Sequence, residues 1–223
     1  MTVLLVLATF LIFIVIDTIL TRRKATAPVA VKTEAGAAAA PEESHVEGFL
    51  VPRDLRYHPG HSWLMRERKN VMRIGVDEFA AALLGKIEKI ELPKPGHWVR
   101  QGQNALGFRK GEEKAEMVCP IEGEVVEVNP EVLNNPALLR SDPYGKGWLM
   151  SVFVPDEEST TRNLLPRNLV QAWMRETVEK LYGMQPQLAG VVAADGGKPV
   201  EDLSLAFPEE PWAKLTGEFF LTR

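Results

Sequence analysis

The sequence predicts a mainly β domain with short helices, preceded by an N-terminal transmembrane helix and followed by a helical C-terminal extension. Three observations lead to this class. The first residues of the chain are almost all apolar, the middle consists of short apolar runs separated by glycine and proline, and helical spacing returns near the C-terminus. With 223 residues and 45% hydrophobic side chains, the chain is long enough to fill the core of one or two domains.

The N-terminal run, residues 2–20 (TVLLVLATFLIFIVIDTIL), predicts a transmembrane helix whose only charge is Asp17. A helix of this length spans about 28 Å, close to the hydrocarbon thickness of a bilayer. The basic residues 22–24 follow at once, and such residues stay on the cytoplasmic side. We therefore expect residues 1–24 to form a single-pass membrane anchor that leaves the rest of the chain in the cytoplasm.

The next segment, residues 25–47, predicts a flexible linker. It is rich in alanine, proline and glutamate and contains no aromatic residue. Such a segment cannot bury enough apolar surface to offset the entropy of ordering it. Its mean span is roughly 25 Å, so a domain beyond it stays near the membrane while it moves freely.

The central residues 48–157 predict the β domain itself. Residues 71–76 (VMRIGV) alternate as a half-buried strand does, and residues 77–85 (DEFAAALLG) read as a short helix between a capping Asp77 and Gly85. The later runs KIEKIELP, GHWVRQGQNALGF, AEMVCPIEGEVVEVN and GWLMSVFVP indicate a small barrel or sandwich. The pattern G-x-[IV]-x-x-[IV] occurs twice, at residues 85–90 and 123–128. This repeat predicts a barrel of two similar halves joined by a protruding hairpin.

Composition and motifs exclude several function classes. The net charge of −4 and the pI near 5.7 argue against a nucleic-acid partner. The single Cys119 excludes an internal disulfide and a cysteine-only metal site, and we expect it to be a buried small hydrophobe. His58 and His61 are separated by Pro59 and Gly60, which predicts a turn rather than a metal site. No catalytic triad order, zinc spacing or nucleotide loop is visible, so we expect no enzyme activity.

Three tryptophans, Trp63, Trp98 and Trp148, lie within or beside predicted strands. Together they would suit a ligand cage. Aromatic residues in strands more often pack in a core, so we expect all three to do so.

The central domain resembles the lipoyl-bearing H protein of the glycine cleavage system. The matching runs are HSWL (residues 61–64), IGVDEFAAALLGKIEKIELPKPG (74–96) and PIEGEVVEVNPEVLNNPALLRSDPYGKGWL (120–149). The resemblance implies a barrel-sandwich hybrid fold, as in lipoyl and biotinyl carriers. It also implies a protein that is not itself a catalyst: a lipoyl arm on one lysine carries an aminomethyl group between a glycine decarboxylase, a folate-dependent transferase and a lipoamide dehydrogenase.

The lysine that the family modifies is missing from its usual position. It lies eight residues before the proline that matches Pro120, and in this chain that position is Glu112. A carboxylate cannot form the amide to lipoic acid. Lys110 and Lys114 are each displaced by two residues, which keeps them on a similar strand face but off the hairpin tip. Two readings follow: the domain carries no cofactor, or lipoate is attached to Lys114 or Lys110 on a rebuilt hairpin.

The C-terminal extension, residues 158–223, predicts one clear helix. RNLVQAWMRETVEKLYGMQP (residues 167–186) has apolar side chains at helical spacing, which indicates a face packed on its own domain or a partner-binding helix. The chain ends with Trp212, Phe219 and Phe220, and these aromatic residues need cover. We expect them to return to the barrel or to dock on another subunit.

Two functions are consistent with these features. The first is a membrane-tethered H-protein-like domain that is not lipoylated and acts as a noncatalytic interaction module. Its partner would be a cytoplasmic or membrane-bound protein complex, with the glycine cleavage enzymes among the candidates. The alternative is a lipoyl carrier that shuttles an aminomethyl group on Lys114 or Lys110.

Overall fold

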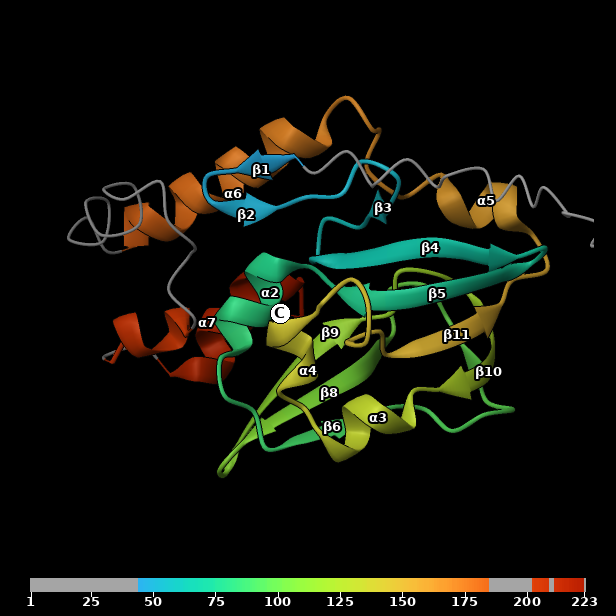
Figure 1. Cartoon of the computed structure of the whole chain (residues 1–223), viewed down its shortest axis with the longest axis horizontal. Helices are drawn as coiled ribbons and strands as arrows, with labels where there is room; N and C mark the ends of the chain where they lie inside the picture. Colours follow the sequence, from blue (N-terminus) through green and yellow to red (C-terminus); the bar gives the residue numbers. More distant parts are fainter. Residues whose placement is uncertain (1–43, 185–201, 209–210, 223) are drawn as a thin grey trace, which may run out of the picture. The chain divides into compact units, whose positions relative to one another are not determined.

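The computed structural model describes residues 44–184, 202–208 and 211–222 (Figure 1). The predicted transmembrane segment lies outside these residues, as does most of the predicted linker. None of the helices in the described part is long and apolar enough to span a bilayer. A strand already begins at His45, inside the segment predicted to be linker, because β1 (His45–Val46) pairs with β2 (Phe49–Leu50) and buries Val46.

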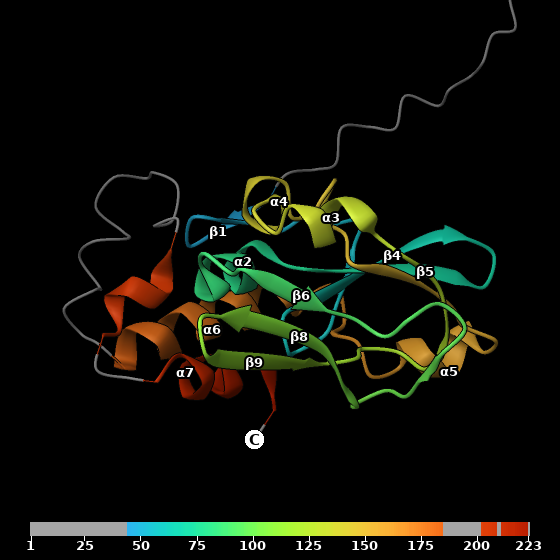
Figure 2. The same cartoon turned by 90° about the horizontal axis from the view of Figure 1, so that it is seen from below.

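The fold is mainly β with short helices, as predicted. Besides the β1–β2 hairpin there is a six-stranded sheet in the order β3-β4-β5-β11-β10-β7 and a three-stranded sheet in the order β6-β8-β9 (Figures 1 and 2). All of these strand pairs are antiparallel. The strands of the two larger sheets are β3 (Arg56–Tyr57), β4 (Ser62–Arg68), β5 (Val71–Val76), β6 (Lys89–Glu91), β7 (Trp98–Val99), β8 (Asn104–Lys110), β9 (Glu113–Val118), β10 (Gly123–Val128) and β11 (Met150–Phe153).

The core lies between the inner faces of the two larger sheets. Leu64 and Ile74, which are paired in one sheet, and Phe108 and Met117 from the other are fully buried. Full burial of a side chain of this size contributes about 1.5–3 kcal/mol to folding. The Trp63 ring packs so tightly on β5 that a Cβ at Gly75 would overlap it, which explains the glycine in this central strand.

Short helices close the ends of the sheets. They are α2 (Glu78–Leu84), α3 (Pro130–Asn134), α4 (Leu138–Ser141) and α5 (Glu157–Thr161). The prediction for residues 77–85 is confirmed: the Asp77 carboxylate accepts the Ala80 N–H at 2.8 Å, and Gly85 ends the helix with a φ of 63°.

The two copies of the G-x-[IV]-x-x-[IV] pattern do not form equivalent strands. The second copy is β10, in the six-stranded sheet. The first copy begins with the glycine that terminates α2, and only its last residues enter the short strand β6. The predicted equivalence of the two copies is therefore wrong, because Gly85 has a positive φ and ends a helix, whereas Gly123 has no positive φ and begins a strand.

The C-terminal extension returns to the β domain. It contains α6 (Val170–Met184), the 3-10 helix η2 (Leu203–Ala206) and α7 (Trp212–Phe220). α6 packs beside β1 (Figure 1), and α7 runs along β9 (Figure 2). The 3-10 helix η2 packs on α2. The aromatic residues Trp212, Phe219 and Phe220 are buried. Of the two expectations for these side chains, packing on the same chain is the correct one.

Candidate functional site

The candidate site is the hairpin that joins β8 to β9. Lys110 and Glu113 are the last paired residues of these strands, so the turn between them consists of Gly111 and Glu112. Gly111 has a φ of 59°, a backbone conformation that glycine adopts without strain. Glu112 is exposed. Glu112, which the sequence analysis predicts to occupy the position of the modified lysine, thus lies at the tip of a tight two-residue turn.

Lys110 faces the C-terminal extension. Its Nζ donates a hydrogen bond to Ser204 Oγ at 2.6 Å and lies 3.9 Å from Asp202 Oδ2. The same ammonium group lies 5.9 Å from the centre of the Trp212 ring. This lysine is therefore held by three side chains from a part of the chain that is distant in sequence.

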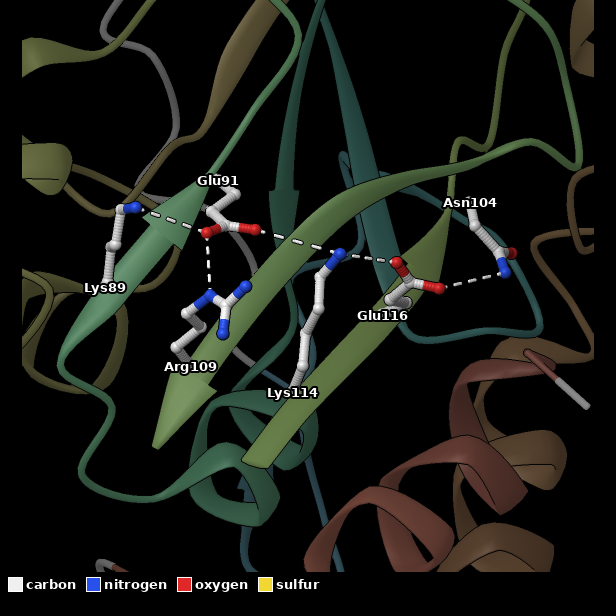
Figure 3. Close-up of polar contacts among 6 residues, drawn as sticks. All are labelled: Lys89, Glu91, Asn104, Arg109, Lys114 and Glu116. Carbon is white, nitrogen blue, oxygen red and sulfur yellow. Dashed lines mark hydrogen bonds and ion pairs between the residues drawn. The ribbon is translucent and has the colours of Figure 1, made fainter. Parts of the chain in front are cut away.

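Lys114 faces the opposite side of the sheet (Figure 3). Its Nζ lies 2.7 Å from Glu116 Oε1 and 3.7 Å from Glu91 Oε2. The hydrogen bond to Glu116 is the main reason that the pKa of Lys114 is raised above its ordinary value. The amine is thus in its charged form at neutral pH and has two acidic neighbours.

Glu91 lies at the centre of this charged surface. Its Oε1 accepts from Arg109 Nε at 2.7 Å and from Lys89 Nζ at 3.3 Å (Figure 3). These bonds, the one from Arg109 first, lower the pKa of the Glu91 carboxyl group. Asn104 extends the network by donating to Glu116 at 3.3 Å. The outer face of the three-stranded sheet therefore carries charges of both signs that largely compensate one another.

The expectation that both lysines lie on a similar strand face is wrong. Lys110 is paired with Glu113, and Lys114 is paired with Arg109. Side chains of successive residues alternate between the faces of a strand, so the two lysines lie on opposite faces. The reason is the two-residue turn: it places Glu113 opposite Lys110 on the same face, so Lys114, the next residue, points to the other face.

The C-terminal extension also braces the hairpin and the end of α2. The Trp212 N–H donates to Glu113 Oε1 at 3.1 Å, and the Trp212 indole donates to the Leu83 carbonyl at 3.4 Å. Asp202 accepts the N–H of Lys86 at 3.2 Å. Its carboxylate lies so close above Gly85 that a Cβ there would collide with it. Sequence reasoning missed Asp202. Its hydrogen bond from the Ser204 N–H is a local capping pattern that the sequence could have indicated, but its contact with the end of α2 depends on the tertiary structure.

The two neighbouring histidines are part of the packing. His61 Nδ1 lies 2.8 Å from Asp77 Oδ2, and the His61 ring lies between Phe79 and Trp173 at centroid distances of 4.6 and 4.5 Å. His58 Nδ1 accepts the Gly60 N–H at 3.0 Å. Burial, and secondly the charge of His61, lowers the pKa of His58 from 6.5 to about 4. Within the described part of the chain, no three metal-binding side chains are grouped around a common point.

Cys119 is buried, and its thiol donates to the Ile121 carbonyl at 3.2 Å. Burial raises the pKa of this thiol to about 11, so the nucleophilic thiolate is disfavoured at neutral pH. The side chain behaves as the buried small hydrophobe that the sequence predicts.

Comparisons with known proteins relate the β domain and α6 to a single family. The family profile described as "Glycine cleavage H-protein" matches residues 55–177, more than half of the chain. The glycine cleavage system H protein of Alteromonas mediterranea is 39% identical over 106 residues, which cover 48% of this chain and 82% of that protein. The corresponding protein of Carboxydothermus hydrogenoformans is 36% identical over 119 residues, or 53% of this chain and 91% of that protein.

The solved structures give the same result. The crystal structure of a glycine cleavage system H protein from Mycobacterium marinum aligns with a TM-score of 0.50 and 26% sequence identity, covering 57% of this chain and 99% of that one. Residues beyond 177, which include η2 and α7, lie outside the profile match. The side chains that hold Lys110 therefore come from outside the region that matches the family.

Proposed function

This chain belongs to the glycine cleavage H-protein family, and from that premise we propose that it is a membrane-tethered member without a lipoyl group, acting as a noncatalytic protein-interaction module. Members of this family carry an intermediate on a lipoylated lysine and have no catalytic activity of their own. Without the arm, the domain retains a folded surface that partners can bind. In this function the chain brings a partner complex to the membrane rather than transferring a chemical group.

The observation that carries the proposal is Glu112 at the hairpin tip. The turn has only two residues, Gly111 and Glu112, so neither side chain at the tip carries an amine. Lipoate attaches through an amide, and an amide needs a primary amine where Glu112 has a carboxylate. The proposal depends on this one substitution.

The surroundings of the flanking lysines support the same conclusion. Attaching lipoate to Lys110 would remove its charge and displace it from Ser204 and Asp202, two partners within the folded chain. Lys114 lies on the other face, away from the tip, between two carboxylates. Neither amine extends freely from the end of the hairpin.

The membrane tether rests on the sequence. The apolar residues 2–20 are followed directly by the basic residues 22–24, a charge order that leaves the globular domain on the cytoplasmic side. A flexible tether raises the effective concentration of the domain near a membrane-bound partner, up to about the millimolar range. A shuttle between several soluble enzymes gains less from such confinement. This favours a dedicated partner complex at the membrane.

A second candidate is a lipoyl carrier modified on Lys114. The observation that favours it is that this side chain is 38% exposed and that its partners are solvent-accessible carboxylates. Ion pairs of this kind contribute only about 0–1 kcal/mol, so they hold the amine weakly. In that case the aminomethyl chemistry of the family would be retained on a displaced arm.

Intact mass spectrometry separates the two candidates. The full-length chain is expressed in a host that lipoylates its own H protein, extracted from the membrane and weighed. We expect the mass of the unmodified polypeptide. An added lipoyl group that disappears in Lys114→Arg, but not in Lys110→Arg, would replace the proposed function by the second candidate.

A further inference from the structure

The outer face of the six-stranded sheet carries exposed large apolar side chains near its β7 edge. Trp98 is 50% exposed, Val126 41% and Phe153 39%. The expectation that Trp98 packs in the core is therefore wrong, whereas Trp63 is fully buried and Trp148 is partly buried. Apolar side chains that lie together on an exposed surface mark interaction sites in soluble domains.

Strand pairing brings these side chains together. Glu124 on β10 is paired with Trp98 on one side and with Phe153 on the other, so the three side chains form one row across three strands. Residues opposite one another in a sheet lie on the same face. Val126 lies in the bulge of β10 between Val125 and Glu127, on the strand that runs through the middle of this row.

Acidic side chains lie within this row and beside it. Glu122, Glu124 and Glu127 are all exposed, and within the described residues none of them forms an ion pair. Trp98 donates its indole N–H to Glu122 at 3.3 Å. Arg100, which follows β7, supplies one positive charge against these three.

The basic side chains on the neighbouring strands are already paired. Arg68 lies 3.1 Å and Arg73 3.5 Å from the Glu67 carboxylate. Arg73 also stacks on Trp148 at 4.6 Å from the ring centre. The two arginines share the single carboxylate of Glu67, so with Arg100 they set three positive charges against four glutamates and leave this face with a net charge of −1.

We propose that this aromatic–acidic face (Trp98, Val126 and Phe153 with Glu122, Glu124 and Glu127) binds a basic segment of a partner protein that carries apolar side chains between its lysines or arginines. The inference rests on the proposed function, because a module without an arm acts through a surface. Buried aromatic and aliphatic contacts supply the affinity. The unpaired carboxylates select a positively charged partner and speed its association.

Site-specific photo-crosslinking in membranes of the cells that make the protein tests this inference. The probe is p-benzoylphenylalanine in place of Phe153 in the full-length chain, and mass spectrometry identifies the attached peptide. We expect attachment to a net positive segment of another polypeptide. The double variant Glu124→Lys, Glu127→Lys should lower the crosslink yield about tenfold or more, since like charges would then oppose each other.

Leu169 provides the matched control position, because it is 48% exposed and lies in the turn before α6. The probe placed there should give no crosslink to the same partner. A urea unfolding curve of the charge-reversed variant, unchanged from that of the parent, shows that any lost crosslink reflects the surface and not unfolding.

Several outcomes would overturn the inference. Attachment at Phe153 to residues 1–43 of the same chain, to a second copy, or to an acidic segment would refute the proposed occupant, as would a yield that ignores the charge reversal. If a probe at Glu112 gives crosslinks but the probe at Phe153 gives none, the aromatic–acidic face is not the binding surface. The proposed function as an interaction module would still stand. Crosslinks from neither position, together with a lipoylated intact mass, would refute the proposed function itself.

Discussion

Among single residues, Glu112 has the largest effect on what the hairpin can do. The strands on either side of it are paired up to Lys110 and Glu113, so the turn itself does not depend on which side chain occupies its second position. A carboxylate there prevents amide formation with lipoate while leaving the backbone of the hairpin unchanged. Under the proposed function, the loss of the arm would therefore need no rearrangement of the fold.

Glu112→Lys should restore an acceptor for lipoate. We expect the full-length variant from a lipoylating host to gain the mass of one lipoyl group, because the new amine would be exposed at the tip of the turn. Glu158→Lys introduces an exposed lysine in α5, outside the hairpin and its neighbouring strands, and should stay unmodified. An unmodified Glu112→Lys variant would mean that the hairpin differs from a lipoylation substrate in more than this residue.

His58 makes the stability of the domain depend on pH. Its pKa is lowered from 6.5 to about 4 in the folded protein, so the unfolded chain binds a proton more readily between these values. The contribution of neutral His58 to the free energy of unfolding is fully present above pH 6.5. It is lost as the pH falls towards 4, which lowers the free energy of unfolding by up to about 3 kcal/mol. Urea unfolding of the detergent-solubilised chain at pH 7, 5.5 and 4 measures this, and His58→Asn, which cannot titrate, should show a smaller decrease. If the free energy of unfolding falls equally in the parent and in His58→Asn, titratable groups other than His58 cause the pH dependence.

Among the secondary-structure elements, α7 connects the parts of the candidate site. Phe219 packs on Phe79 with a centroid distance of 5.3 Å and also faces His61. Glu218 forms an ion pair with Lys180 of α6 at 2.7 Å. Through Trp212 the same helix reaches the β8–β9 hairpin. The helix thus links α2, α6 and the hairpin.

Phe219→Ala should destabilise the domain by about 3–5 kcal/mol, because it removes a buried aromatic ring and leaves a cavity against α2. Leu205→Ala is the matched control: this leucine lies in the same extension but is 72% exposed. Its loss should change the free energy of unfolding by less than about 0.5 kcal/mol. Chemical denaturation of both variants measures the difference, and similar effects would show that α7 is not part of the cooperative core.

For the whole molecule, the proposed function combines a membrane anchor with a folded binding domain. The described residues, 44–184, 202–208 and 211–222, contain a large hydrophobic core. The anchor is therefore expected to determine where the domain is, and not whether it folds.

Deleting residues 1–24 should move the protein from the membrane fraction to the soluble fraction. Ultracentrifugation of cell lysate followed by immunoblotting measures this, and carbonate extraction of the full-length chain provides the comparison for an integral protein. The unfolding free energy of the domain should stay the same. If the shortened chain still sediments with membranes, a second membrane contact exists in the remaining sequence.

The sequence is a good guide to elements that depend on local patterns. The strand at residues 71–76 and the helix between Asp77 and Gly85 follow from alternation and capping, and both are present in the structure. The G-x-[IV]-x-x-[IV] pattern fails because it contains no information on the backbone angle of its glycine. The prediction that Trp98 packs in the core fails for a different reason. Strand residues alternate between two faces, and only the packing of the sheets shows which face is covered.

By itself, the sequence determined that the domain is mainly β and that it is similar to H proteins, and it predicted that Glu112 occupies the position of the modified lysine. These features depend on residue order and local periodicity, which can be read without coordinates. Only the tertiary structure decided that Lys110 is held by Ser204, a residue 94 positions away, and that Lys114 lies on the opposite face. Contacts between such distant segments are set by how the helices and sheets pack, and that packing minimises exposed apolar area over the whole chain rather than within any one segment.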